Sequence, residues 1–177
     1  MYTSERPPGV DVVPLRAGLR GAWRSVGPNV WFLGLTSLLT DVSSEMVTSV
    51  LPLYVVVHLG LSPLAFGLVD GLQHGISALL RMASGALADR SRRHKEVAAA
   101  GYAVSAASRL ALLFAGASLP GLAAAVAGDR IGKGFRTAPR DALISLSARP
   151  ESLGAAFGVH RSLDAAGAAL GPLLAFA

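Results

Sequence analysis

Two carboxylates stand in the middle of a long apolar segment near the start of the chain. Asp41 and Glu45 lie in the stretch LTDVSSEM (39–46), between the apolar runs NVWFLGLTSL and VTSVLPLYVVV. Residues four apart share one face of a helix, so the two acids are expected one turn apart. An ionised carboxylate that faces lipid at mid-bilayer costs about 3 kcal/mol or more. The pair is therefore expected to face a polar cavity or a cationic partner.

The same pair of acids is suited to proton exchange. Two neighbouring carboxylates resist ionising together, which makes one of them a candidate for taking up and releasing a proton. This pattern favours a proton-coupled transporter. The alternative is structural: Asp41 breaks the helix and caps a second short one, with Ser43 and Ser44 satisfying backbone groups.

The apolar segment at about 120–144 carries cations that could meet these acids. Four of them fall within about a third of the helix circumference: Arg130, Lys133, Arg136 and Arg140. This basic stripe could pair with the acids or attract an anionic substrate. Snorkelling to the interface would explain Arg140 best and Arg136 next. Arg130 is too deep for snorkelling to be easy, which makes it the cation of the stripe that is most expected to have a function.

A second acid–base pair, Asp70 and His74, has the same spacing of four residues in the segment at about 63–88. The pair could relay protons, because neutral and charged imidazole are close in energy near neutral pH. A hydrogen bond that fixes the helix to a neighbour explains the pair equally well, and a metal site would need a third ligand. Ion pairs within or between helices are expected for other charges: Arg81, Arg109 and the cluster His160, Arg161 and Asp164.

The composition places these charges in a membrane. Of the 177 residues, 52% are hydrophobic and only 15% are charged, well below the quarter that is usual in soluble domains. Five apolar segments, each long enough to span a bilayer, are separated by turn-prone stretches: about 30–57, 63–88, 97–117, 120–144 and 154–177. None alternates with a period of two, so the predicted fold class is all-α, a polytopic transmembrane helix bundle over 29–177.

The basic residues fall on alternate sides of these segments. They lie in an N-terminal arm, residues 1–28, and in the second and fourth connections: Arg6, Arg16, Arg20 and Arg24; Arg90, Arg92, Arg93 and Lys95; Arg140 and Arg149. The first and third connections have neither Lys nor Arg. By the positive-inside rule, the N-terminus is expected in the cytoplasm and the bundle in the plasma membrane. The arm lacks the apolar core of a signal peptide.

Several other classes of function find no support in the sequence. The chain has no cysteine, which excludes disulfides and Cys-based metal sites, and no cofactor is expected. It has no nucleophile elbow, zinc-protease motif or phosphate-binding loop, so no enzyme is expected. The net charge of +5 could suggest a nucleic-acid binder, but no basic domain or aromatic platform accompanies it.

Glycines at four-residue intervals predict close helix packing, unless their abundance alone explains them: Gly67, Gly71 and Gly75, and Gly167 and Gly171.

Three motifs resemble those of one transporter family. The stretch GALADRSRRHK (85–95) resembles the loop signature of the major facilitator superfamily between the second and third helices. Its matching residues are Gly85, Asp89, Arg90, Arg93 and Lys95, and Arg92 stands where the family usually has a second glycine. The stretch GDRIGKGFRTAPRDA (128–142) resembles the fourth-helix pattern of the family, with matches at Arg130, Lys133 and Gly134. The stretch DAAGAALGPLLA (164–175) resembles the Gly-x-x-x-Gly-Pro pattern of its antiporters through Gly167, Gly171 and Pro172, with Ala175 and Phe176 in place of the closing glycines.

The resemblance implies a secondary transporter that this chain represents only in part. Members of the family have two halves of six helices with the substrate bound between them, and this chain reaches about the fifth helix. The implied partners are membrane lipid, a small-molecule substrate, protons and a missing C-terminal half. Proton-coupled efflux is the expected function, with Arg130 in proton coupling and Gly171 and Pro172 shaping the fifth helix. Uptake of an anionic metabolite and a transport-incompetent fragment are the alternatives.

Overall fold

The computed structural model describes residues 23, 26–60, 62–115 and 118–177. Its long helices are α2 (Pro28–Leu53), α3 (Pro63–Ser91), α4 (His94–Ala115), α5 (Leu119–Ser147) and α6 (Leu153–Ala175). The π-helix η1 (Tyr54–His58) continues α2, and the 3₁₀ turn η2 (Pro150–Ser152) precedes α6. No strand occurs in these ranges, and the all-α fold class is confirmed. The predicted arm, 1–28, lies outside the described residues except for 23 and 26–28.

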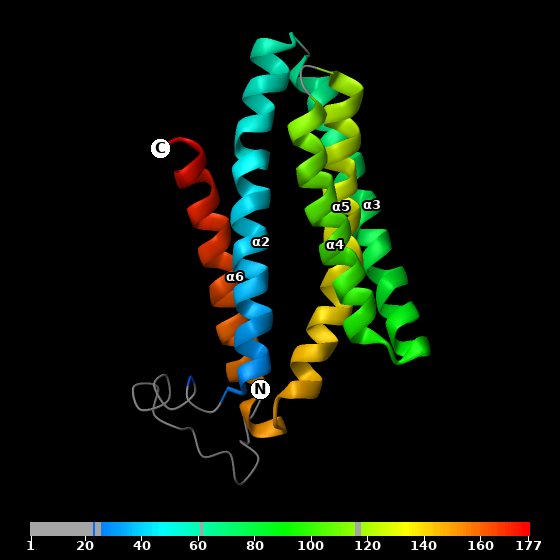
Figure 1. Cartoon of the computed structure of the whole chain (residues 1–177), viewed down its shortest axis with the longest axis vertical. Helices are drawn as coiled ribbons and strands as arrows, with labels where there is room; N and C mark the ends of the chain where they lie inside the picture. Colours follow the sequence, from blue (N-terminus) through cyan, green and yellow to red (C-terminus); the bar gives the residue numbers. More distant parts are fainter. Residues whose placement is uncertain (1–22, 24–25, 61, 116–117) are drawn as a thin grey trace, which may run out of the picture.

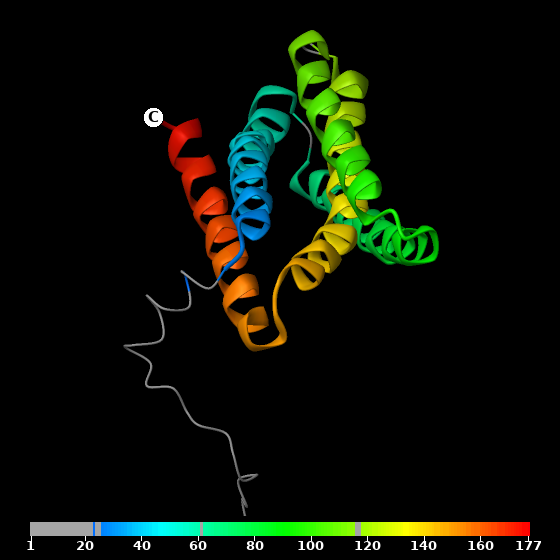
Figure 2. The same cartoon turned by 60° about the horizontal axis from the view of Figure 1, so that its bottom comes forward.

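The helices form two groups. Helix α2 packs along α6, and α5 packs against both α4 and α3. Figure 1 shows the pair α2 and α6 beside the trio α3, α4 and α5. In Figure 2 the C-terminal part of α5 leaves the trio and leads through η2 into α6. The chain therefore crosses between the groups twice, at the end of η1 and at the end of α5.

Helix α2 runs without interruption through the region of the two acids. Its first turn begins at Pro28, where the missing N–H of proline costs nothing. Pro52 lies inside its last turn, and the chain widens into η1 directly after it, which accommodates the missing backbone donor. Gly60, with φ of 68°, then ends the helical path in the left-handed conformation that glycine tolerates. Because Asp41 lies well inside α2, the alternative of a helix break there is wrong.

Glycines bring the helix backbones close together within each group. A Cβ built on Gly132 of α5 would lie 2.7 Å from the carbonyl oxygen of Gly101 in α4. In the other group, a Cβ on Gly167 of α6 would lie 2.7 Å from the carbonyl oxygen of Leu38 in α2. One on Gly171 would lie 2.9 Å from the corresponding oxygen of Val42. The packing expected of Gly167 and Gly171 is confirmed.

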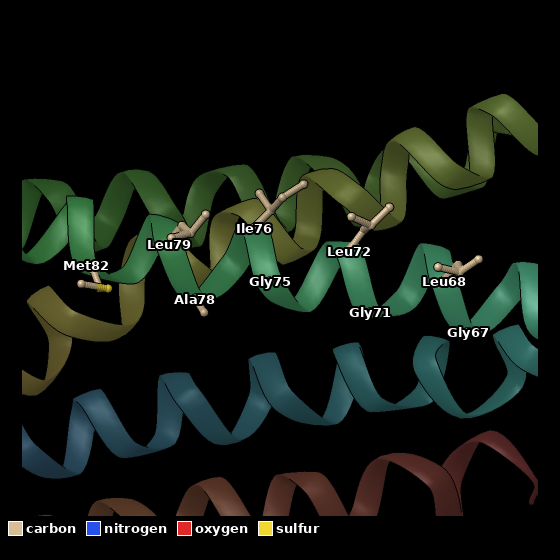
Figure 3. A pocket seen from close by; sticks show the side chains of 9 residues that line it. All are labelled: Gly67, Leu68, Gly71, Leu72, Gly75, Ile76, Ala78, Leu79 and Met82. Atoms are coloured by element: carbon tan, nitrogen blue, oxygen red, sulfur yellow. The ribbon is translucent and has the colours of Figure 1, made fainter.

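The glycine repeat of α3 faces open space and not a neighbouring helix. A Cβ built on Gly67, Gly71 or Gly75 would meet no atom within 4 Å, so the expectation that this repeat packs against another helix is wrong among the described residues. Together with outward-facing apolar side chains, these glycines line a shallow groove of about 690 Å³ along α3 (Figure 3). Spacing alone indicated a small-residue stripe but not whether a helix of this chain would cover it.

The charged connection between α3 and α4 is mostly helical. The sequence predicts a loop over 89–96, whereas α3 ends at Ser91 and α4 begins at His94. The Nε2 atom of His94 lies 2.9 Å from Oδ1 of Asp89 and ties the two helix ends together. Arg92, in the position where the family usually has glycine, takes a φ of 54°. The tight turn therefore forms with a left-handed arginine in place of the glycine.

Large apolar side chains face outward and polar ones face inward. Phe114 is 87% exposed and Leu64 is 77% exposed, while Arg136 and His160 are among the largest side chains that are fully buried. A soluble protein rarely exposes so much contiguous apolar surface, whereas lipid solvates it well. By length and composition alone, one described helix, α4, is apolar and long enough to cross a membrane. The five spans, and with them the domain division, stay a prediction.

Candidate functional site

A polar cleft of about 380 Å³ lies between the two helix groups. We call it the charged cleft and define it by the ionisable side chains that line it: Asp41 and Glu45 of α2, Arg81 of α3, Lys133, Arg136 and Arg140 of α5, and Arg161 and Asp164 of α6. Residues that are far apart in the sequence thus meet at one place, and most of them come from α2 and α5.

The two acids of α2 face the cations of α5. Oδ1 of Asp41 lies 3.1 Å from Nη2 of Arg136 and 3.7 Å from Nζ of Lys133. Oε1 of Glu45 lies 3.6 Å from the same Nζ. Lys133 therefore stands between two carboxylates, as expected of acids that must avoid lipid. The side chain of Asp41 is 10% exposed and that of Glu45 is 26% exposed, so Glu45 is the acid more open to solvent.

Arg136 is enclosed instead of reaching the interface. Its side chain is 1% exposed, and its Cζ lies 4.6 Å from the centroid of the Tyr102 ring in α4. The ring face stabilises the guanidinium on one side, and Asp41 stabilises it on the other. Two donors of Arg136, Nε and Nη1, have no hydrogen-bond partner in the described structure. Sequence reasoning left Arg136 as a snorkelling candidate, and the enclosure by α2 and α4 makes that interpretation wrong.

Arg140 is also buried, and its predicted snorkelling is wrong for the same reason. It is 4% exposed and donates from Nη1 to Oγ of Ser37 in α2 over 2.8 Å. Its Nη2 lies 3.0 Å from Oδ1 of Asp141 and 3.6 Å from Oδ2 of Asp164 in α6. Arg140 therefore joins α5 to both α2 and α6.

Arg130 faces away from the acids that it was expected to influence. Its Nη2 lies 3.9 Å from Oδ1 of Asp70 in α3, and among the described residues this is its ion-pair partner. Arg130 and Arg136 are six residues apart, which places them about 120° apart around the helix. Arg136 consequently takes the position beside Asp41 that the sequence suggested for Arg130.

Asp70 and His74 do meet, as their spacing predicts. Nδ1 of His74 lies 3.4 Å from Oδ2 of Asp70 and 2.9 Å from its carbonyl oxygen. The side chains are 37% and 55% exposed, and Arg130 approaches Asp70 from α5. The geometry fits a contact between α3 and α5, and it leaves proton relay by this pair a prediction.

A third polar contact joins α2, α4 and α5. Nη2 of Arg109 lies 2.8 Å from Oδ1 of Asp129 and donates to Oγ of Ser44 over 2.5 Å, and that hydroxyl donates to Oδ2 of Asp129 over 2.9 Å. The interhelical pair expected of Arg109 is confirmed. Asp129 was missed, although an acid inside an apolar segment is the same signal that singled out Asp41.

The charges in the first half of α6 form the expected salt-bridge cluster. Oδ2 of Asp164 lies 3.3 Å from Nη1 of Arg161 and 3.5 Å from Nδ1 of the buried His160. Arg161 also reaches Asp141 of α5 over 3.0 Å, a partner that sequence reasoning missed.

Arg81 makes no ion pair within the described ranges, which contradicts the interhelical pair expected of it. In the same ranges, no group of three His, Asp or Glu side chains could hold a metal ion.

Comparisons with known proteins match this arrangement to one family. Residues 33–176 match the Major Facilitator Superfamily. An uncharacterised MFS-type transporter of Methanocaldococcus jannaschii is 42% identical over 153 residues, which are 85% of this chain and 37% of the relative. Uncharacterised proteins of Mycobacterium tuberculosis and Mycobacterium bovis are each 38% identical over 153 residues, 86% of this chain and 36% of the relative. The chain thus spans little more than a third of the length of these relatives, and no solved structure gives a significant match.

Proposed function

The chain belongs to the major facilitator superfamily, and we propose that it forms the proton- and substrate-binding part of a secondary transporter for a small solute. The family consists of multi-pass membrane proteins that transport solutes. The observation that supports proton coupling is the position of Lys133 between Asp41 and Glu45 in the charged cleft. Among the described residues Lys133 is the ion-pair partner of Glu45, and it shares its charge with Asp41, which Arg136 also holds.

Glu45 is the proposed proton acceptor. Its side chain is 26% exposed, so water in the cleft can deliver a proton to it, whereas Asp41 is held by the buried Arg136. When Glu45 is protonated, the attraction between its carboxylate and Lys133 is lost, and Lys133 remains paired with Asp41 alone. The charge of the cleft therefore changes by one unit with each proton, which couples proton binding to the substrate.

Helix α6 and the α3–α4 turn are the proposed moving parts. A Cβ on Gly171 would lie 2.6 Å from Cβ of Glu45, so α6 lies directly against the proton acceptor. We propose that Gly167, Gly171 and Pro172 let α6 change its curvature when the protonation of Glu45 changes. The turn motif, Gly85, Asp89, Arg90 and Arg93, would follow the same movement at the other side of the bundle.

The expected setting is the plasma membrane, with the N-terminus in the cytoplasm and a C-terminal half completing the substrate site. Efflux by exchange with protons is the proposed direction, on the resemblance of α6 to the antiporter pattern. Uptake of an anion is the second candidate, and the cations of the charged cleft favour it. A fragment that transports nothing by itself is the third, because alternating access in this family uses two halves.

Proton movement tests the proposal. The chain would be reconstituted into liposomes that contain a pH-sensitive dye, both alone and together with the remaining part of the Methanocaldococcus jannaschii relative. We expect Glu45→Gln to abolish solute-dependent proton movement, because the amide cannot release a proton. Glu151→Gln removes the same charge from the exposed turn before α6 and is expected to leave proton movement unchanged. Unchanged proton movement in Glu45→Gln would contradict the proposal.

A further inference from the structure

We propose that the charged cleft binds a small organic anion, and that Arg81 and Lys133 hold its acid group. This inference rests on the proposed function, names the substrate class of the same site, and favours its second candidate direction, uptake of an anion together with a proton. It depends on three features of the cleft: its charge balance, the unpaired state of Arg81, and the incomplete hydrogen bonding of Arg136.

The charge balance of the cleft is positive. Five cations and three carboxylates line it, the carboxylates being Asp41, Glu45 and Asp164. Asp141 does not line the cleft, but it forms ion pairs with Arg140 and Arg161. Counting it still leaves one cation in excess. A surplus positive charge at membrane depth is costly, and a bound anion would neutralise it.

Arg81 is the cation of the cleft that has no ion-pair partner among the described residues. It lines the cleft from α3 and its side chain is exposed. Among the described residues it forms no ion pair, whereas Arg136 is held by Asp41, and Arg140 and Arg161 are held by Asp164. A guanidinium offers two parallel donors that fit a carboxylate or a phosphate. Arg81 is therefore placed to supply the main contact with an anionic ligand.

Lys133 is the second contact because its partners are shared. Its Nζ lies 3.7 Å from Asp41 and 3.6 Å from Glu45, both longer than a strong charge-assisted hydrogen bond. Its side chain is 33% exposed, so a ligand in the cleft can reach it. Asp41 is also bonded to Arg136, which weakens its hold on Lys133. Glu45 then remains as the competitor of the anion for Lys133.

Arg136 adds a buried positive charge to the wall of the cleft. It lines the cleft, its side chain is 1% exposed, and its Nε and Nη1 have no hydrogen-bond partner among the described residues. Buried donors of a charged group are rarely left without acceptors. An anion in the cleft would add negative charge beside this guanidinium, whose ion-pair partner is Asp41. The predicted ligand is therefore negatively charged, not neutral or cationic.

The experiment uses three probes of nearly equal shape and different charge. The purified chain in detergent micelles would be titrated with benzoate, benzamide and benzamidinium, and binding would be measured by calorimetry and by the shift of the thermal unfolding midpoint. We expect benzoate to bind and to raise the midpoint, and the other two probes to do neither. Arg81→Gln is expected to weaken benzoate binding about tenfold, because one charge-assisted contact is lost. Glu45→Gln is expected to strengthen it, because Lys133 loses a competing partner.

Arg149→Gln is the matched control, since it removes an exposed arginine outside the cleft and is expected to leave benzoate binding unchanged. Helix content by circular dichroism would confirm that each variant is folded. The inference is overturned if benzoate does not bind, if benzamidinium binds as well as benzoate, or if Arg81→Gln binds benzoate like the parent chain. Loss of benzoate binding with normal proton coupling would leave the proposed function standing. Benzoate binding with proton movement that is insensitive to Glu45→Gln would overturn the proton mechanism alone.

Discussion

Asp41 of α2 holds Arg136 of α5 across the boundary between the two helix groups, with 3.1 Å between Oδ1 and Nη2. The arginine side chain is 1% exposed and the aspartate 10% exposed, so solvent cannot replace either partner. A buried ion pair adds little stability compared with apolar residues, but removing one member leaves an uncompensated charge. The pair therefore fixes where α2 lies against α5 more than it adds to the total stability.

Replacing the aspartate of this pair should be costly. We expect Asp41→Asn to lower the free energy of unfolding by about 3 kcal/mol, because Arg136 loses the carboxylate that balances it. Unfolding in detergent, followed by circular dichroism, measures the change. Glu45→Gln is the matched variant: its acid is more exposed and its ion pair longer, so a loss of less than about 1 kcal/mol is expected. Equal losses would contradict this view of the Asp41 pair.

Replacing a glycine by alanine should destabilise the protein where another helix lies close to that glycine, and should not do so where the space is open. Gly132→Ala is expected to lower the free energy of unfolding by about 1–3 kcal/mol, because its Cβ would meet the backbone of α4 at 2.7 Å. Gly71→Ala meets no atom within 4 Å and should raise it by about 0.5–1 kcal/mol through helix propensity. The same detergent unfolding assay compares the two. A stabilising Gly132→Ala would show that α4 and α5 are not in such close contact.

Arg92 has a left-handed backbone conformation in the α3–α4 turn, and replacing it by glycine should stabilise the protein. Arg92 has a φ of 54°, a conformation that costs a residue with a Cβ about 1 kcal/mol or more. Arg92→Gly is therefore expected to raise the unfolding free energy by about 1 kcal/mol. Arg90→Gly lies in the last turn of α3 and should lower it by a similar amount, because glycine destabilises a helix. Changes of the same sign in both variants would refute the assigned turn geometry.

The orientation in the membrane can be tested because the chain has no cysteine. Ser91 and Ser118 are exposed near opposite ends of α4. In intact cells, we expect a membrane-impermeant maleimide to label Ser118→Cys, and to label Ser91→Cys only after the cells are opened. This outcome follows from the basic residues around Ser91 and their absence near Ser118. Labelling in the reverse order would invert the predicted topology.

The sequence was sufficient for the class of fold and for the family. Long apolar segments without alternation predicted an all-α bundle, and the motifs around Asp89, Arg130 and Gly171 resemble the family that the comparisons show. Asp41 and Glu45 could be singled out because an acid in an apolar segment needs a partner. The same rule applies to Asp129, which sequence reasoning missed.

The choice of partners could not be predicted, because it depends on how the helices are rotated and packed. A stripe about a third of a helix wide contains Arg130 at one edge and Arg136 at the other. Only the packing of α5 between α2 and α3 decides that Arg136 meets Asp41 and that Arg130 meets Asp70. For the same reason, the glycines of α3 and those of α6 have equal spacing in the sequence and different surroundings in the structure.

Helix α5 supplies one partner to every ion pair that crosses between the two groups in the described part of the chain: Asp41 with Arg136 and Lys133, Glu45 with Lys133, Asp164 with Arg140, and Arg161 with Asp141. A rotation of this single helix about its axis would strain all of these bonds in the same instant. A proton or a ligand that rotates α5 would therefore break these ion pairs together, whereas the hydrogen bond from Arg109 of α4 to Ser44 of α2 joins the groups without α5.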